Sequence, residues 1–317
     1  MIIYTLLAVA LTIPNEAVLV TRLTNLTNSE TMHGQFLDRS SDPNTVSVAA
    51  TGLGNLALAV AADRGWCERD FAVRNITQGF EFTIAANSPK NRGWLPHFTD
   101  VSGQPKSYSE ISTIDTALFY AGMLQAAEVL KLTELRQKIE AELKKIDTDF
   151  VMIDGYFSHG FYWDQKTGKP DMIKFTWSDT SEGVILYRLF NKPFSPKVSR
   201  VDYPLFVYCY PLLFFNEDNY FELLDQAIEY QTKTYGYAGV TATDGPTGYV
   251  VDDKQVISPL LLASISTRYP HVTETLDKLN VDPNIAAYHV PSQWKSDGEL
   301  TIDLASAYIL FVRLGKK

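Results

Sequence analysis

The feature that most constrains this chain is an alternation between two kinds of helical segment. Residues 45–66, "TVSVAATGLGNLALAVAADRGW", are almost all small or apolar, which predicts a helix buried on most sides. Residues 68–86 instead carry an apolar stripe, with acids in the first turn. Residues 109–132 are apolar again, and the following "TELRQKIEAELKKIDTDFV" has Glu and Lys at helical spacings typical of a solvated helix.

The rest of the chain continues this pattern. Further helices are expected at 179–191, 204–215, 219–234, 255–268, 270–279 and 301–314. Strand signal is confined to residues 159–177, where a Lys-Thr-Gly-Lys turn between aromatic and β-branched runs predicts a hairpin. No Pro-, Gly- or Ser-rich linker divides the chain. We therefore expect an all-α fold, an (α/α)6 toroid barrel with a small β-hairpin near the cleft, as a single domain over residues 1–317.

Composition excludes some classes of partner and cofactor. The net charge is −9 and no basic cluster is present, which argues against a nucleic-acid partner. The five histidines and two cysteines show no zinc-like spacing, so neither a metal nor another cofactor is expected, and Cys67 and Cys209 are expected to be buried free thiols. Aromatic residues make up 12% of the chain, which suits either a carbohydrate-binding groove or a large helical core.

The N-terminus begins with about a dozen apolar residues, too few to span a bilayer. Residues 1–12 are therefore interpreted either as an atypical or truncated signal peptide or as a buried first helix, with no stable membrane insertion. A periplasmic or secreted location is expected, and a cytoplasmic one is left open.

Four acids lie where chemistry, rather than solvation, would explain them. Asp115 borders the buried face of "STIDTALFYAG", Glu182 precedes the apolar run "GVILY", and Asp303 lies in the first turns of "TIDLASAYILF". Asp244 lies on the turn "TATDGPTGYVV". A buried carboxylate must be paired, hydrogen-bonded or in contact with a wet cavity. The structural alternatives are a helix cap or an arginine pair for Asp115, a capping box for Glu182, and a plain Asp-Gly turn for Asp244.

Aromatic side chains are available near these acids in the sequence, namely Trp94, Phe161, Tyr162, Trp163 and Trp177. Cleavage of a glycosidic bond needs one acid to protonate the leaving oxygen, another to activate water, and rings that stack on sugar faces. His97 and His159 could bind a substrate hydroxyl or be plain structural histidines. No Gly-x-Ser-x-Gly elbow, P-loop or dinucleotide fingerprint favours another chemistry.

Seven segments resemble, in order, those of the bacterial glycoamylase-like proteins, which include endo-β-1,2-glucanases of glycoside hydrolase family 144. They span roughly residues 36 to 314: "FLDRSS…VSVAATGLGNLALAVAADRGW", "GWLPHF", "YSEISTIDTALFYAGML", "WSDTSEGVILYRL", "PLFVYCYPLLFF", "YAGVTATDGPTGY" and "GELTIDLASAYILF". The resemblance implies an (α/α)6 barrel that cleaves glucans, β-1,2-linked in characterised members, with inversion.

By motif position, the resemblance makes Glu182 the general acid. It places Asp115 and Asp244 in the cleft, where either could position water or substrate, and makes Asp303 a further cleft acid. Substrate-binding roles are expected for Trp94, His97, Tyr162, Trp163 and Trp177, with an oligo- or polysaccharide as the partner.

The chain departs from the family at two places. Tyr208-Cys209-Tyr210 replaces the usual His-Gln-Tyr, and "AAYHVPSQW" stands near the place of an aromatic Gly-Phe-Tyr-Asp segment. The chain is also shorter than typical members. Two further interpretations therefore stay open, a non-catalytic carbohydrate-binding protein on a decayed glycosidase scaffold and, against the overall acidity, a polysaccharide lyase.

Overall fold

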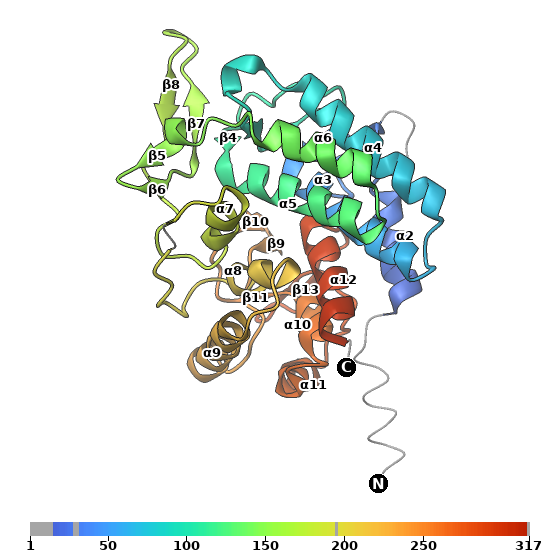
Figure 1. Ribbon diagram of the computed structural model, residues 1–317. Coiled ribbons are helices and arrows are strands. Elements are labelled where there is room, and N and C mark those ends of the chain that lie inside the picture. The colour runs from blue at the N-terminus through green and yellow to red at the C-terminus, as the bar shows by residue number, and fades with distance from the viewer. Residues whose placement is uncertain (1–14, 28–31, 194–195, 316–317) are drawn as a thin grey trace. The chain divides into compact units, whose positions relative to one another are not determined.

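The computed structural model describes residues 15–27, 32–193 and 196–315 (Figure 1). They form two compact units, one from Arg22 to Ser199 and the other from the residues up to Thr21 together with those from Arg200 on. Helix α2 (Glu16–Asn25) crosses the boundary in the sequence. The single domain expected over the whole chain stays a prediction, and the expectation for residues 1–12 lies outside the described residues. Among the described helices, none is both long and apolar enough to cross a membrane.

The helices of the Arg22–Ser199 unit confirm the alternation predicted from the sequence. Helices α3 (Val48–Asp63) and α5 (Thr113–Val129) are buried along most of their length. Helices α4 (Arg69–Ala86) and α6 (Thr133–Leu143), which follow them, expose one face. The unit ends with the short buried helix α7 (Gly183–Leu189).

Two glycines allow α3 and α5 to pack backbone against backbone. A Cβ atom on Gly52 would lie 2.4 Å from the Cα of Phe119, and one on Gly122 would lie 2.4 Å from the carbonyl oxygen of Gly52. No larger residue fits such an approach. Gly52 of the "TGLGNLALAV" segment therefore serves helix packing.

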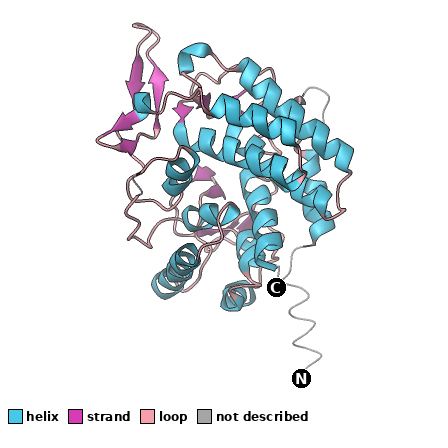
Figure 2. Cartoon of the chain, in the orientation of Figure 1, coloured by secondary structure: helices cyan, strands magenta, loops and turns pink. Residues whose placement is uncertain are grey.

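Short antiparallel strands join these helices (Figure 2). The predicted hairpin is confirmed as β7 (Gly160–Trp163) paired with β8 (Pro170–Met172), and it extends a four-stranded sheet of order β2-β4-β7-β8. The other strands of this unit are β1 (Val46–Ser47), β2 (Leu95–Pro96), β3 (Phe98–Thr99), β4 (Ile111–Ser112), β5 (Met152–Ile153) and β6 (Tyr156–Phe157), with 3₁₀ helices η2 (Pro89–Asn91) and η3 (Asp149–Val151).

The second unit also combines buried and amphipathic helices. The seven residues of α10 (Pro259–Ile265) are all buried, whereas α9 (Asp218–Tyr235) is amphipathic. Its elements are α8 (Phe206–Cys209), η4 (Tyr210–Leu213), α9 (Asp218–Tyr235), β9 (Thr243–Gly245), β10 (Gly248–Val250), β11 (Val256–Ile257), α10 (Pro259–Ile265), η5 (Pro270–Val272), α11 (Thr273–Leu279), β12 (Tyr288–His289), β13 (Trp294–Lys295) and α12 (Thr301–Gly315). The expectation that strands are confined to residues 159–177 is therefore wrong.

One local rule explains why several helices begin later than predicted. Helices α3, α5 and α10 each follow a two-residue strand, and a serine caps each of them: Ser47, Ser112 and Ser258. Each serine hydroxyl accepts a hydrogen bond from the backbone N–H three residues on, which satisfies one of the free donors of the first turn. The apolar run therefore begins as a strand and becomes a helix at the serine.

The two cysteines are both free, but only one is buried. Cys209 lies in the core with no exposed area. Cys67 is partly exposed just before α4, so the expectation of two buried thiols is wrong for Cys67.

Candidate active site

Asp115 is fixed by the cap that starts helix α5. Ser112 accepts a hydrogen bond from the backbone N–H of Asp115 at 3.3 Å, and its hydroxyl donates to Asp115 Oδ2 at 2.5 Å. The Asp115 residue is only 7% exposed. The structural alternative is thus partly right, because Asp115 belongs to a helix cap. Its other oxygen, Oδ1, faces a histidine.

Glu182 lies just before its helix, whereas the helix expected over residues 179–191 would have placed it in the first turn. Helix α7 begins at Gly183, after a turn in which the backbone N–H of Gly183 bonds to the carbonyl of Thr180. Glu182 is therefore the N-cap residue, yet its side chain makes no capping hydrogen bond. The capping-box explanation does not account for this acid.

The environment of Glu182 favours its protonated form. The residue is 6% exposed, and its side chain makes no hydrogen bond or ion pair among the described residues. Burial and, second, the negative charge of Asp115 raise its pKa to about 8. A carboxyl with such a raised pKa keeps its proton near neutral pH.

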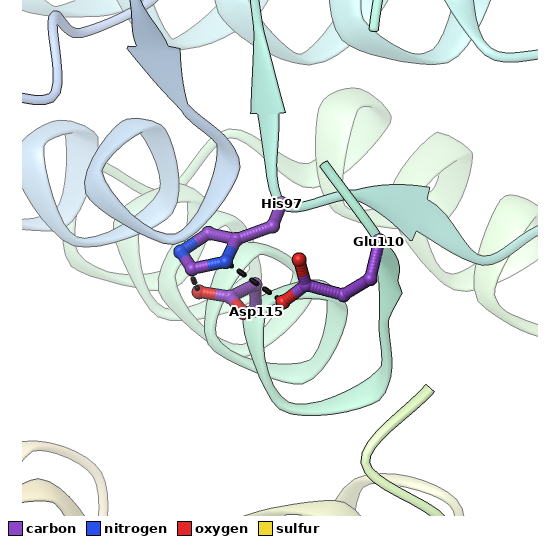
Figure 3. A group of neighbouring side chains, drawn as sticks. All are labelled: His97, Glu110 and Asp115. Atoms are coloured by element: carbon purple, nitrogen blue, oxygen red, sulfur yellow. Dashed lines mark hydrogen bonds and ion pairs between the residues drawn. The ribbon is translucent and has the colours of Figure 1, made fainter. Parts of the chain in front are cut away.

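His97 lies between two carboxylates (Figure 3). Its Nδ1 is 2.9 Å from Glu110 Oε1, and its Nε2 is 3.6 Å from Asp115 Oδ1. Burial lowers the pKa of His97, but Asp115 and Glu110 outweigh burial and raise it to about 9. In turn, the hydrogen bond and charge of His97 outweigh burial at Glu110 and lower the pKa of that carboxyl.

The same three groups are the candidates, among the described residues, for holding a metal ion, since their ligand atoms lie within 4.8 Å of one another. A cation there would displace the protons that His97 presents to the two carboxylates. The arrangement is fully accounted for by a charged imidazole between two anions. Glu110 was not singled out in the sequence.

A second histidine on this unit has the opposite character. Burial lowers the pKa of His159, although Asp115 and Glu110 act in the other direction. Its ring makes edge contacts with Trp177 and Phe175, at centroid distances of 4.7 and 5.6 Å. His159 is therefore neutral at neutral pH, beside a charged His97.

The structure corrects the expected aromatic platforms. Trp94 has no exposed area, and its Nε1 donates to the carbonyl of Asp147, so it is a core residue. Trp177 is 5% exposed and donates to Thr113 Oγ1, which leaves almost no face for a sugar. Both were expected to bind substrate, and burial removes them from that role.

Other rings on the same unit are accessible. Tyr162 is 45% exposed, in agreement with its expected role, and Trp163 is partly exposed with its Nε1 hydrogen-bonded to Asn91. Tyr108 and Phe175, which the sequence analysis did not single out, are 60% and 49% exposed. The ring of Phe175 contacts His159. The ring of Tyr108 contacts Phe98, and the ring of Phe98 stacks on His97.

In the other unit, the structure brings Asp303 next to the strand that carries Asp244. Asp244 is the central residue of β9 and pairs with Tyr249 of β10 in a β-hairpin whose loop has two residues. The segment expected to be a loop is therefore one strand of a hairpin. The hydroxyl of the preceding Thr243 donates to Asp303 Oδ2 at 2.8 Å. Both acids are half-buried. The plain-turn alternative therefore does not describe Asp244, which lies within a strand.

The amino-acid sequence matches no protein-family model and no curated protein sequence. The structure does match solved structures. A candidate glucoamylase from Bacteroides uniformis gives a TM-score of 0.73 at 16% identity, over 96% of this chain and 94% of its own. An endo-β-1,2-glucanase from Chitinophaga pinensis, in complex with sophorotriose and glucose, gives a TM-score of 0.69 at 16% identity, over 96% of this chain and 93% of its own.

A β-1,2-glucanase from Parabacteroides distasonis gives a TM-score of 0.75 at 15% identity; the match covers 95% of this chain but 56% of that protein. These similarities show a shared fold. The predicted all-α class, of the (α/α)6 kind with small β-hairpins, is therefore confirmed, and so, at the level of the fold, is the resemblance to glycoamylase-like proteins and endo-β-1,2-glucanases.

Proposed function

We propose that this chain is a glycoside hydrolase that cleaves a β-1,2-linked glucan with inversion at the anomeric carbon. The observation that carries the proposal is the buried carboxyl of Glu182, whose pKa burial and Asp115 raise to about 8. A general acid must hold its proton until the leaving oxygen takes it, and such a raised pKa keeps the proton in place at neutral pH.

In this mechanism Glu182 donates its proton to the glycosidic oxygen while a carboxylate takes one from the attacking water. Asp115 and Asp244 are the two candidates for that second role, as the sequence resemblance implies. An inverting site needs two carboxyl groups separated by about 6.5–9.5 Å, so that water fits between base and sugar. Asp303, held by the Thr243 hydroxyl, would accept hydrogen bonds from substrate hydroxyls.

The substrate class is supported by chemistry and by similarity. Exposed rings at Tyr162 and Phe175 offer flat faces for sugar rings. Two of the similar structures are β-1,2-glucanases, one with sophorotriose and glucose bound. A linear β-1,2-glucan is therefore the first substrate to test.

A non-catalytic carbohydrate-binding protein is the second candidate. It is favoured by the segment that replaces the family's His-Gln-Tyr, because two of the replacing side chains belong to the core. Cys209 is fully buried, and Tyr208 is 1% exposed, with its hydroxyl donating to the carbonyl of Arg200 at 3.0 Å. Neither side chain could take over a substrate contact from His or Gln.

Both candidates are tested by one set of assays. The purified protein is incubated with linear β-1,2-glucan, laminarin, cellulose-type glucans and α-glucans, and new reducing ends are measured. Release of products from β-1,2-glucan that first appear as the α-anomer by NMR would support the proposal. Oligosaccharide binding by calorimetry with no turnover on any glucan would favour the binding protein instead.

A further inference from the structure

Glu110, His97 and Asp115 form a continuous chain of charged contacts on the same unit as Glu182 (Figure 3). The two nitrogens of His97 contact different carboxylates, Nδ1 at 2.9 Å from Glu110 and Nε2 at 3.6 Å from Asp115. The 2.9 Å contact is a hydrogen bond, whereas 3.6 Å is the separation of an ion pair. A carboxylate beside each nitrogen favours the doubly protonated imidazolium, the form that carries a proton on both nitrogens.

The backbone holds His97 in this position. Strands β2 and β4 pair Leu95 with Ser112 and Pro96 with Ile111, so the same register places His97 opposite Glu110. The backbone N–H of His97 donates to the carbonyl of Glu110 at 2.9 Å. On the other side, the carbonyl of His97 accepts from the backbone N–H of Val48 at 3.1 Å. The backbone of His97 is thus tied to two segments, and its ring stacks on the ring of Phe98 at a centroid distance of 3.7 Å.

Of the other titratable groups near His97, Asp38 also favours the charged imidazolium, whereas His159 does not. Asp38, which pairs with Arg39, adds a negative charge and also favours the imidazolium. His159 is the remaining titratable neighbour in this electrostatic group, and burial keeps it neutral at neutral pH. Three carboxylates therefore surround one cation.

We propose that Glu110 and His97 are positioning residues that keep a positive charge beside Asp115, so that of the Asp115 and Glu182 carboxyls it is Glu182 that keeps its proton. The inference rests on the proposed function, because it explains how a site with two neighbouring carboxyls assigns acid and anion. Two like groups close together cannot both ionise easily, and the one next to a cation ionises first. His97 is next to Asp115.

This assignment also changes the role of His97 from that expected from the sequence. Nδ1 is hydrogen-bonded to Glu110 and Nε2 lies beside Asp115, so in this proposal the ring serves the two carboxylates rather than a substrate hydroxyl. Glu110 orients the ring from behind, much as a carboxylate orients a catalytic histidine. Neither residue is catalytic in this account, since each acts through Asp115.

The direct test follows the protonation of His97 by NMR in protein labelled at histidine Cε1, with the signal identified by its loss in His97→Gln. In the wild type we expect a titration midpoint about 9. In Glu110→Gln, which keeps the shape of the side chain but removes its charge, the midpoint should fall by about one unit or more. A wild-type midpoint near the ordinary histidine value of 6.5 would overturn the proposal.

The second readout is the pH dependence of turnover. His97→Gln removes the positive charge beside Asp115, so the acidic limb of the kcat/KM profile should move to higher pH, by about one unit. The matched control is His271→Gln, which removes an exposed histidine 3.9 Å from Asp225 and should leave the profile unchanged. A lower kcat/KM in His97→Gln with an unmoved acidic limb would show a merely structural role and overturn the proposal.

The two readouts separate this inference from the proposed function. The NMR titration needs no substrate, so it decides the state of His97 even if no glucan is cleaved. Inactivity on every glucan would count against the hydrolase alone. If His97→Gln does not fold, Glu110→Gln carries the test, and an unchanged His97 midpoint in that variant would also overturn the proposal.

Discussion

The two units carry their acids in different ways. In the unit from Arg22 to Ser199, Glu182 is buried without a hydrogen-bond partner among the described residues, and Asp115 is pinned between a serine hydroxyl and an imidazolium. In the other unit, Asp244 and Asp303 are half-buried, on a hairpin arm and a first helical turn, with a threonine hydroxyl on one of them.

The difference separates two tasks that carboxyl groups perform. A buried acid beside an anion has its proton affinity altered and suits proton transfer. A half-buried acid that accepts a hydroxyl hydrogen bond suits the binding of water or sugar hydroxyls. The comparison therefore predicts that Glu182 and Asp115 act on the proton and that Asp244 and Asp303 act on the placement of water or sugar, and the following variants test that division.

The largest effect is expected from Glu182→Gln. Glutamine keeps the shape but has no proton to give, so kcat should fall by about 10²–10⁴-fold while oligosaccharide binding survives. Turnover of β-1,2-glucan and calorimetric affinity are measured together. The control is Glu140→Gln on α6, which loses only an exposed pair with Arg136 and should keep normal turnover. Near-normal turnover in the Glu182 variant, with lower thermal stability, would make Glu182 a helix-terminus residue only.

Asp244→Asn and Asp115→Asn should come next, since either residue could position or activate water. Loss of that carboxylate should lower kcat by about 10-fold or more. If Asp115→Asn is damaging and Asp244→Asn is not, Asp115 takes the base role and the second unit loses its part in the reaction. Thr243→Val, which removes the hydrogen bond from Thr243 Oγ1 to Asp303 Oδ2, should act more weakly, by a few-fold in KM.

Stability should also depend on pH through the first unit. The folded pKa of Glu182, about 8, lies above its ordinary value of 4.5, so the folded state binds the extra proton between these values. Stability from this source is complete below about pH 4.5 and is lost as pH rises to 8 and above. His97 acts in the same direction between 6.5 and about 9.

We therefore expect a lower Tm at pH 9 than at pH 6, with a smaller fall in Glu182→Gln. Calorimetry in matched buffers measures both slopes. A Tm that rises over this range, or equal slopes in the two proteins, would mean that Glu182 is ionised in the folded state at neutral pH.

The smallest effects are expected from the rings. Phe175→Ala or Tyr162→Ala removes an exposed face and should raise KM by about 2- to 10-fold with little change in Tm. Trp94→Phe should instead lower Tm and leave KM unchanged, because Trp94 is fully buried and its hydrogen bond to the carbonyl of Asp147 is lost. A raised KM for Trp94→Phe at unchanged stability would restore the original expectation for this tryptophan.

The helical pattern was predictable because burial leaves a local trace in the sequence. The run of small apolar residues in α3 indicates a buried helix, and the helical spacing of charged residues in α6 indicates an exposed one. Glu182 could be found for the same reason, since an acid before "GVILY" must enter the core. The burial of Trp94 could not be predicted, because a tryptophan has the same local sequence signal whether its ring packs in a core or binds a sugar.

The contact between Glu110 and His97 was missed because it depends on pairing between distant two-residue strands. Ser112 pairs with Leu95 on one side and with Gly160 on the other. A two-residue strand is too short for its sequence to predict which strands it pairs with. Read alone, Glu110 is an acid in a polar loop. Once the β2–β4 register is known, its place opposite His97 follows.

The central claim is that Glu182 holds a proton in the folded chain at neutral pH. The most direct measurement is a pH titration of the carboxyl signal of Glu182 by NMR, in protein labelled at glutamate Cδ and assigned by loss of the signal in Glu182→Gln. The account predicts a midpoint about 8. A midpoint near the ordinary value of 4.5 would contradict it, because an ionised Glu182 has no proton to give to a leaving sugar.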